Sequence, residues 1–181
     1  MTKPTVYIFR GAPASGKGTL VPAFCKLLEP PIAHIDQDKF RWDIHLVGRH
    51  VPDVTENEHQ LAWQNTKLIY EQYLKAGKYT IVIEGLFTWN DESSSQGNAR
   101  QLAELAAAHG FDCKSIVLKA GKTTLLQRNA ARSYSVPADE FDVLYDGVYT
   151  VTGPDEIIID STGQTAEQTV QTLQKEVIAS R

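Results

Sequence analysis

The stretch VYIFRGAPASGKGTL, from Val6 to Leu20, places a lysine among three glycines directly after an apolar run. The apolar run predicts a buried β-strand over residues 5–9, and a helical pattern begins at Lys17. Glycines let the backbone turn tightly and approach a ligand closely. Backbone N–H groups of such a turn, at the N-terminus of a helix, form a site for an anion. The stretch therefore predicts a strand, an anion-binding loop and a helix in series.

Residues 11–17 of this stretch fit the phosphate-loop pattern G-x-x-x-x-G-K. In that pattern Lys17 reaches the outer phosphates of a nucleotide as a point charge. The alternative is a glycine-rich turn that only starts a helix, but the strand before it and the helix after it favour the phosphate loop. The residues expected to bind the nucleotide are Gly11, Ala12, Pro13, Ala14, Ser15, Gly16, Lys17, Gly18 and Thr19.

Apolar segments alternate with helical patterns along the rest of the chain. Further strands are predicted at 32–35, 79–83, 112–118 and 156–159, and helices at 17–28, 56–76, 99–109, 123–132, 137–147 and 165–179. We expect an exposed loop over 90–98 and a helix cap at Thr123 or Thr124. This alternation predicts an α/β fold, a five-stranded parallel sheet with helices on both faces. Ligands bind such sheets at the carboxyl ends of the strands, which here are 10–17, 36–41, 84–89, 119–122 and 160–163.

The bulk composition suits one soluble domain over residues 1–181. No apolar run is long enough to span a bilayer or to form a signal peptide, so we expect a cytoplasmic protein with no membrane partner. The net charge of −4 argues against an extended nucleic-acid surface. Cys25 and Cys113 have no metal-binding spacing and are expected to be buried free thiols. The oligomeric state is left open.

The segment GAPASGKGT resembles the phosphate loop of adenylate kinases and related small-molecule kinases. In that version a glycine follows the lysine, as Gly18 does here, and the next threonine, Thr19, faces the inner phosphates. The resemblance implies a P-loop NTPase kinase fold that uses ATP and Mg²⁺, with the metal held largely through water and distant carboxylates. Two cysteines cannot form a four-cysteine zinc knuckle, so the chain departs from long-lid adenylate kinases.

The segment HIDQDKFRWD follows the second predicted strand. Asp38 and Arg41 are three residues apart and share one face of a helix. They resemble the Asp-x-x-Arg of polynucleotide kinases and of zeta-toxin-like bacterial P-loop kinases. The resemblance implies that Asp38 takes the proton of the acceptor hydroxyl, that Arg41 holds the acceptor, and that residues 38–76 bind it. Asp36 is a candidate for Mg²⁺ or for the acceptor. The alternative is an N-cap aspartate beside a solvated arginine.

Two further segments complete the candidate site. Glu84 ends the strand TIVIEG, where a Walker B carboxylate would orient Mg²⁺ or its water, although it could instead cap the next turn. Arg128 and Arg132 share one helical face within LLQRNAARSYSVP, which resembles the short lid of the same kinases, here about 126–140. The resemblance implies that both arginines clamp the transferring phosphate, the alternative being a solvated basic face. By the same resemblance residues 160–163 lie near the adenine.

The sequence therefore predicts a kinase that transfers the γ-phosphoryl group of ATP to a small-molecule acceptor, with a hydroxyl favoured. Lys17, Asp38, Arg128 and Arg132 are the expected catalytic residues. A polynucleotide 5′-kinase, a nucleoside monophosphate kinase and an ATP-binding regulatory protein with negligible turnover remain as alternatives. Motifs and spacing do not identify the acceptor.

Overall fold

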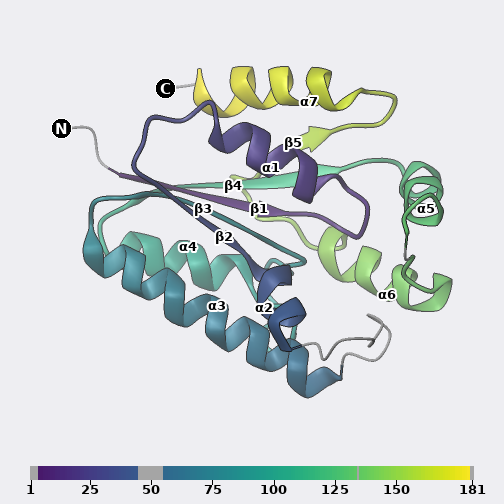
Figure 1. The fold of residues 1–181 in the computed structure, drawn as a ribbon, viewed down its shortest axis with the longest axis horizontal. Coiled ribbons are helices and arrows are strands. Elements are labelled where there is room, and N and C mark those ends of the chain that lie inside the picture. Colours follow the sequence, from purple (N-terminus) through teal and green to yellow (C-terminus); the bar gives the residue numbers. More distant parts are fainter. Residues whose placement is uncertain (1–3, 45–54, 134, 180–181) are drawn as a thin grey trace.

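The computed structural model describes residues 4–44, 55–133 and 135–179, arranged around a parallel sheet of strand order β2-β3-β1-β4-β5 (Figure 1). The strands are β1 (Thr5–Arg10), β2 (Ile32–Asp36), β3 (Thr80–Gly85), β4 (Asp112–Lys119) and β5 (Ile157–Asp160). The helices are α1 (Lys17–Cys25), α2 (Gln37–Ile44), α3 (Glu56–Ala76), α4 (Ala99–Ala108), α5 (Lys122–Ala130), α6 (Ala138–Tyr149) and α7 (Ala166–Leu173), which a π-helical turn, Gln174–Ile178, extends. The predicted five-stranded parallel sheet is confirmed.

Helices cover both faces of the sheet, as Figure 1 shows: α1 and α7 lie on one face, and α3 and α4 on the other. Successive side chains of β1 alternate between these faces, because a strand has a side-chain period of two. Val6 and Ile8 enter the cluster under α3 and α4, whereas Tyr7 and Phe9 enter the cluster under α1 and α7. Each large apolar side chain buried in this way contributes about 1.5–3 kcal/mol.

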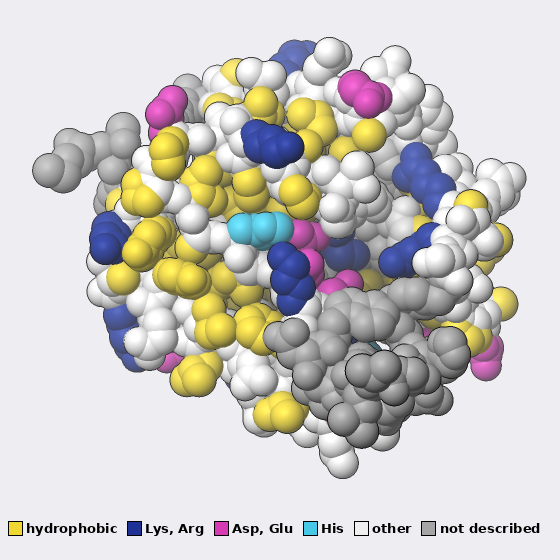
Figure 2. Space-filling view, viewed as in Figure 1, with side chains coloured by type: hydrophobic (Ala, Val, Ile, Leu, Met, Phe, Trp, Pro, Cys, Tyr) yellow, Lys and Arg dark blue, Asp and Glu magenta, His cyan; other side chains and the backbone are white. Residues whose placement is uncertain are grey.

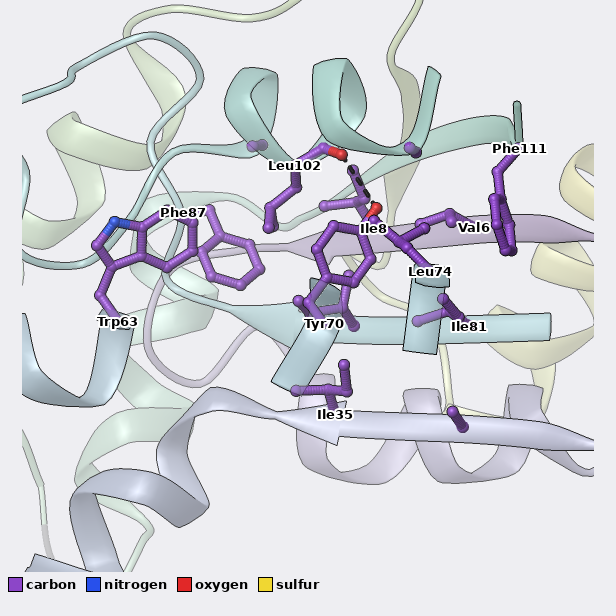
Figure 3. Close-up of a cluster of buried hydrophobic side chains, with 14 residues drawn as sticks. Val6, Ile8, Ile35, Trp63, Tyr70, Leu74, Ile81, Phe87, Leu102 and Phe111 are labelled. Atoms are coloured by element: carbon purple, nitrogen blue, oxygen red, sulfur yellow. Dashed lines mark hydrogen bonds between the residues drawn. The ribbon is translucent and has the colours of Figure 1, made fainter. Parts of the chain in front are cut away.

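Aromatic side chains fill the cluster under α3 and α4 (Figure 3). Tyr70 is fully buried, and its hydroxyl donates a hydrogen bond of 3.0 Å to the carbonyl of Leu102 on α4. The ring centroids of Trp63 and Phe87 lie 5.8 Å apart. The inward-pointing aromatic residues Trp63 and Tyr70 of α3 therefore serve the core.

The register of the sheet brings three predicted functional segments together. Asp36 at the end of β2 lies beside Glu84 on β3, and Glu84 lies beside Phe9 on β1. The chain turns into the glycine-rich loop directly after β1. Because all strands run the same way, their carboxyl ends form one edge where these segments meet.

Several local expectations need correction. The first helix ends at Cys25 rather than Leu28, and the helix after β4 is preceded by Gly121, so neither Thr123 nor Thr124 caps it. The helix that follows Pro137 continues to Tyr149. The loop 90–98 is exposed only in its first part; Ser95, Gly97 and Asn98 are buried, and Gly97 lies against the Trp63 ring.

The two cysteines are free thiols, as predicted, but each is only partly buried. Within the described ranges, no helix combines the length and the apolar character needed to cross a membrane.

Candidate active site

The glycine-rich loop has a shape that depends on unusual backbone conformations. Gly16 has φ +96°, and Ala14 has φ +62°, a value that non-glycine residues adopt rarely. The loop closes on itself through a hydrogen bond of 3.2 Å from the Ser15 N–H to the Ala12 carbonyl. Strained residues of this kind concentrate at ligand-binding sites. The loop is therefore held in a fixed concave form at the start of α1.

Lys17 begins α1 and folds back over this loop. Its Nζ donates to the Gly11 carbonyl at 2.6 Å and lies 3.4 Å from the Ala12 carbonyl. Burial lowers the pKa of Lys17 to about 8; the nearby Glu84 carboxylate opposes this shift, and Arg41 adds to it. The ammonium group is thus poorly solvated, so an incoming anion would stabilise its charged form.

A buried ion pair supports the phosphate loop at its first residues. The Arg10 guanidinium, immediately before Gly11, contacts the Glu156 carboxylate at 2.5 and 2.7 Å and donates to the Val148 carbonyl. The Tyr149 hydroxyl accepts from the Ala12 N–H at 3.1 Å. These contacts tie the loop to α6 and to the segment before β5. None of them was foreseen from the sequence, because the partners lie far apart along the chain.

Two carboxylates occupy the neighbouring strand ends. Glu84 is nearly buried, with 3% of its side chain exposed, and its Oε1 lies 2.8 Å from Nε2 of His34 on β2. Asp36 accepts a hydrogen bond of 3.0 Å from the Asp38 N–H through Oδ1. Carboxylate oxygens here are suitable ligands for Mg²⁺ or its bound waters.

The predicted Asp-x-x-Arg pair is present on α2. Asp38 and Arg41 form an ion pair, and Nη1 of Arg41 lies 3.3 Å from Nδ1 of His59 on α3. Burial lowers the pKa of His59, and the charge of Arg41 lowers it further. The neutral imidazole can accept from Arg41, which leaves its other nitrogen as a donor. Asp38 lies inside α2 and is ion-paired, and the Arg41 side chain is 14% exposed, so the pair is not an N-cap aspartate beside a solvated arginine.

The two lid arginines do not lie on one helix as predicted, because α5 ends at Ala130 and Arg132 follows it, and their contacts differ. Arg128 donates to the hydroxyl and the carbonyl of Ser161 after β5, both at 3.0 Å, whereas Arg132 lies close enough to Lys17 for its charge to lower the pKa of the lysine. The Asn129 side chain clamps Val136 through two hydrogen bonds, of 2.8 and 3.1 Å. The short α5–α6 connection is thereby fixed beside the loop.

One cavity of about 410 Å³ unites these groups. Figure 2 shows acidic and basic side chains gathered near the centre of one face. The predicted residues that line the cavity are Pro13, Ala14, Ser15, Gly16, Lys17, Gly18, Thr19, Asp36, Asp38, Arg41, Glu84, Arg128 and Arg132. Gly11 and Ala12, at the start of the loop, are buried and do not line the cavity.

The cavity also includes residues that the sequence did not single out. His59, Gln96, Glu140 and Leu144 line it. The Gln96 carbonyl accepts from the Gln37 side chain at 2.9 Å, which fixes that part of the loop against α2. None of these residues belongs to a motif, so only the tertiary fold identifies them.

Comparisons with known proteins agree with this geometry. Residues 6–147 match the model of the AAA_33 family, described as an AAA domain. The match covers more than half of the chain, which therefore belongs to this family. A search of curated protein sequences found no match.

Several of the solved structures that resemble the chain are kinases. A putative kinase from Chloroflexus aurantiacus has TM-score 0.67 and 18% identity, with 100% of each chain covered. A sugar kinase from Janibacter sp. has TM-score 0.62 and 17% identity, with 98% of this chain and 96% of that chain covered. The APS kinase CysC of Mycobacterium tuberculosis, solved with AMPPNP and APS, has TM-score 0.61 and 13% identity, with 96% of each covered. At these identities the likeness establishes the fold, that of a P-loop kinase.

Proposed function

We propose that the protein transfers the γ-phosphoryl group of ATP to a hydroxyl of a small-molecule acceptor. The observation that carries the proposal is the two-sided cavity. The phosphate loop and Lys17 lie on one side, and the Asp38–Arg41 pair with His59 lies on the other. Donor phosphate and acceptor bound there would be held next to each other, and such positioning is the main source of catalysis in phosphoryl transfer.

The donor set also suits Mg²⁺. In kinases this ion keeps several waters and is held by one or two carboxylates together with the substrate phosphates. Asp36 and Glu84 supply two adjacent carboxylates, and within the described ranges no group of three or more metal-ligating side chains is present. Asp36 and Glu84 would hold the ion either directly, through a carboxylate oxygen, or through a water bound to the ion. When bound, Mg²⁺ neutralises charge on the phosphates.

The residues of the chain then have separate roles. The loop N–H groups and Lys17 bind the phosphates of ATP. Asp38, oriented by Arg41, accepts the proton of the acceptor hydroxyl as that oxygen bonds to the γ-phosphorus and the bond to ADP breaks. Arg132 stabilises the charge of the transferring group. Arg128, bonded to Ser161, fixes the loop after β5 beside the nucleotide.

The charges on the acceptor side of the cavity suit a hydroxyl acceptor better than a phosphate acceptor. Three carboxylates, those of Asp36, Asp38 and Glu84, face the cavity near Arg41, which is ion-paired with Asp38. A second phosphate would meet like charge there, whereas a neutral hydroxyl would meet hydrogen-bond acceptors.

The test is a transfer screen with MgATP. ADP release and product mass would be measured with neutral polyols and sugars, nucleoside monophosphates and a 5′-hydroxyl oligonucleotide. We expect transfer to a neutral hydroxyl compound that Lys17→Ala abolishes. Lys122→Ala is the matched control, because Lys122 lies in the similar segment AGKTT but pairs with Asp142 at 2.9 Å outside the cavity. Transfer only to monophosphates or to the oligonucleotide would overturn the hydroxyl assignment. ATP binding without transfer would support a regulatory role.

A further inference from the structure

His34 makes a contact that the roles above do not use. It lies on β2, at the edge of the sheet, and its Nε2 is 2.8 Å from Oε1 of Glu84. The His34 side chain is 24% exposed, whereas that of Glu84 is 3% exposed. The histidine therefore approaches the carboxylate from the solvent side, while Glu84 also lines the phosphate-loop cavity.

The carboxylates of Asp36 and Glu84, the candidate metal ligands, are each held by the protein through one of their two oxygens. Oδ1 of Asp36 accepts from the Asp38 N–H, and Oε1 of Glu84 is held by His34. Among the residues that the structure describes, no hydrogen bond involves the second oxygen of either carboxylate. One oxygen of each pair is thus fixed by the protein, and the other remains for a ligand.

We propose that His34 is a positioning residue that fixes Glu84 so that Oε2 meets Mg²⁺ or its bound water. This inference rests on the proposed function. A glutamate side chain has three rotatable bonds, so a second contact is needed to hold its carboxylate in one place. Outer contacts that orient metal-binding carboxylates commonly contribute 10–100-fold to metal affinity. Because a carboxylate can only accept, this hydrogen bond requires the tautomer in which Nε2 carries the proton.

The alternative is that His34 only compensates a buried carboxylate. The sheet itself gives reason to separate the two roles, because β2 is already paired with β3 from Ile32 to Asp36. Removing His34 leaves the nearly buried Glu84 carboxylate without this partner, so the melting temperature should fall by about 2–12 °C even in the metal-free protein. A positioning role predicts, in addition, a loss of metal affinity in the folded protein, whereas compensation alone predicts only the loss of stability.

The test measures the affinity of Mn²⁺ for the complex of the protein with AMPPNP. The concentration of free Mn²⁺ is monitored by electron paramagnetic resonance. His34→Ala should weaken Mn²⁺ binding about 10–100-fold, while metal-free AMPPNP affinity changes less than about twofold. His34→Gln can place an amide N–H near the position of Nε2 and should restore most of the affinity. His109→Ala, an exposed histidine at the end of α4, is the matched control and should have no effect.

A double mutant completes the experiment. In a Glu84→Gln background, His34→Ala should cause no further loss, because the carboxylate that it positions is gone. An equal loss in both backgrounds, or none in wild-type background, would overturn the inference while leaving the proposed function intact. If His34→Ala does not fold, His34→Asn replaces it. The asparagine side chain is too short to reach Glu84, so His34→Asn should bind Mn²⁺ more weakly than His34→Gln. Equal Mn²⁺ affinity in these two variants would overturn the inference. Failure of the wild-type protein to bind Mn²⁺ with AMPPNP would instead overturn the proposed function.

Discussion

The two sides of the cavity are built in different ways. The phosphate loop on the donor side is one continuous segment, residues 13–19, whose shape comes from its backbone and from the positive φ angles at Ala14 and Gly16. The acceptor side is assembled from α2, α3, the end of β3 and the loop before α4, and it is held by side-chain contacts such as Arg41 to His59. A backbone site suits phosphate, which every nucleotide carries, whereas a combination of side chains can be specific for one acceptor. The difference suggests that mutations on the two sides will separate ATP binding from transfer.

The largest effect is expected where the two sides meet. Arg132→Ala should lower kcat about 10³–10⁵-fold, because an arginine beside a transferring phosphoryl group stabilises charge that develops only in the transition state. Steady-state kinetics with the acceptor found in the screen would measure this loss. Arg128→Ala is the comparison, and it should act more on the KM for ATP because Arg128 is bonded to Ser161. A larger loss of kcat in Arg128→Ala would reverse the two roles.

The next effect concerns the acceptor side alone. Asp38→Asn keeps the shape of the side chain and removes the base, so kcat should fall about 10²–10⁴-fold. The measurement is the same steady-state assay. Normal turnover with a phosphate acceptor would show that no base is required, and the monophosphate-kinase alternative would then replace the hydroxyl kinase.

The pH dependence of nucleotide binding tests the donor side. Burial places the pKa of Lys17 near 8 in the nucleotide-free protein. Below that pH the ammonium is charged and ready for phosphate; above it, binding must first take up a proton. The dissociation constant for AMPPNP should therefore rise about tenfold for each pH unit above 8. Isothermal titration calorimetry in buffers of different ionisation enthalpy should detect that proton uptake, and a flat profile from pH 7 to 10 would contradict this role.

The smallest effect tests how the acceptor side is supported. Gly97 has φ +94°, and an added Cβ would lie 2.6 Å from the Trp63 ring. Gly97→Ala should lower the free energy of unfolding by about 1–3 kcal/mol and raise the acceptor KM through Gln96, with little change in the KM for ATP. Gly110→Ala is the control, because Gly110 has φ +76° but open space around it. Equal losses of stability in the two variants, measured by urea unfolding, would assign the effect to backbone strain alone.

The same contrast explains what the sequence could predict. The alternation of strands and helices, and the loop from Gly11 to Thr19, are local patterns that are read directly from neighbouring residues. The long helix over residues 56–76 also has the predicted bounds. His59 could not be assigned, because its role depends on Arg41, which is 18 residues away. The pair of Arg10 and Glu156, 146 residues apart, is likewise visible only once the sheet is formed.

The most direct test of the account compares AMPPNP–Mg²⁺ affinity in three proteins by isothermal titration calorimetry. The wild-type protein should bind, Lys17→Ala should lose at least about tenfold in affinity because a charge-assisted phosphate contact is removed, and Asp38→Asn should stay within about threefold of wild type because its base acts only in the transition state. This result would show that donor binding and acceptor chemistry belong to separate sides of one cavity. Unchanged affinity in Lys17→Ala, or loss of binding in Asp38→Asn, would contradict that division.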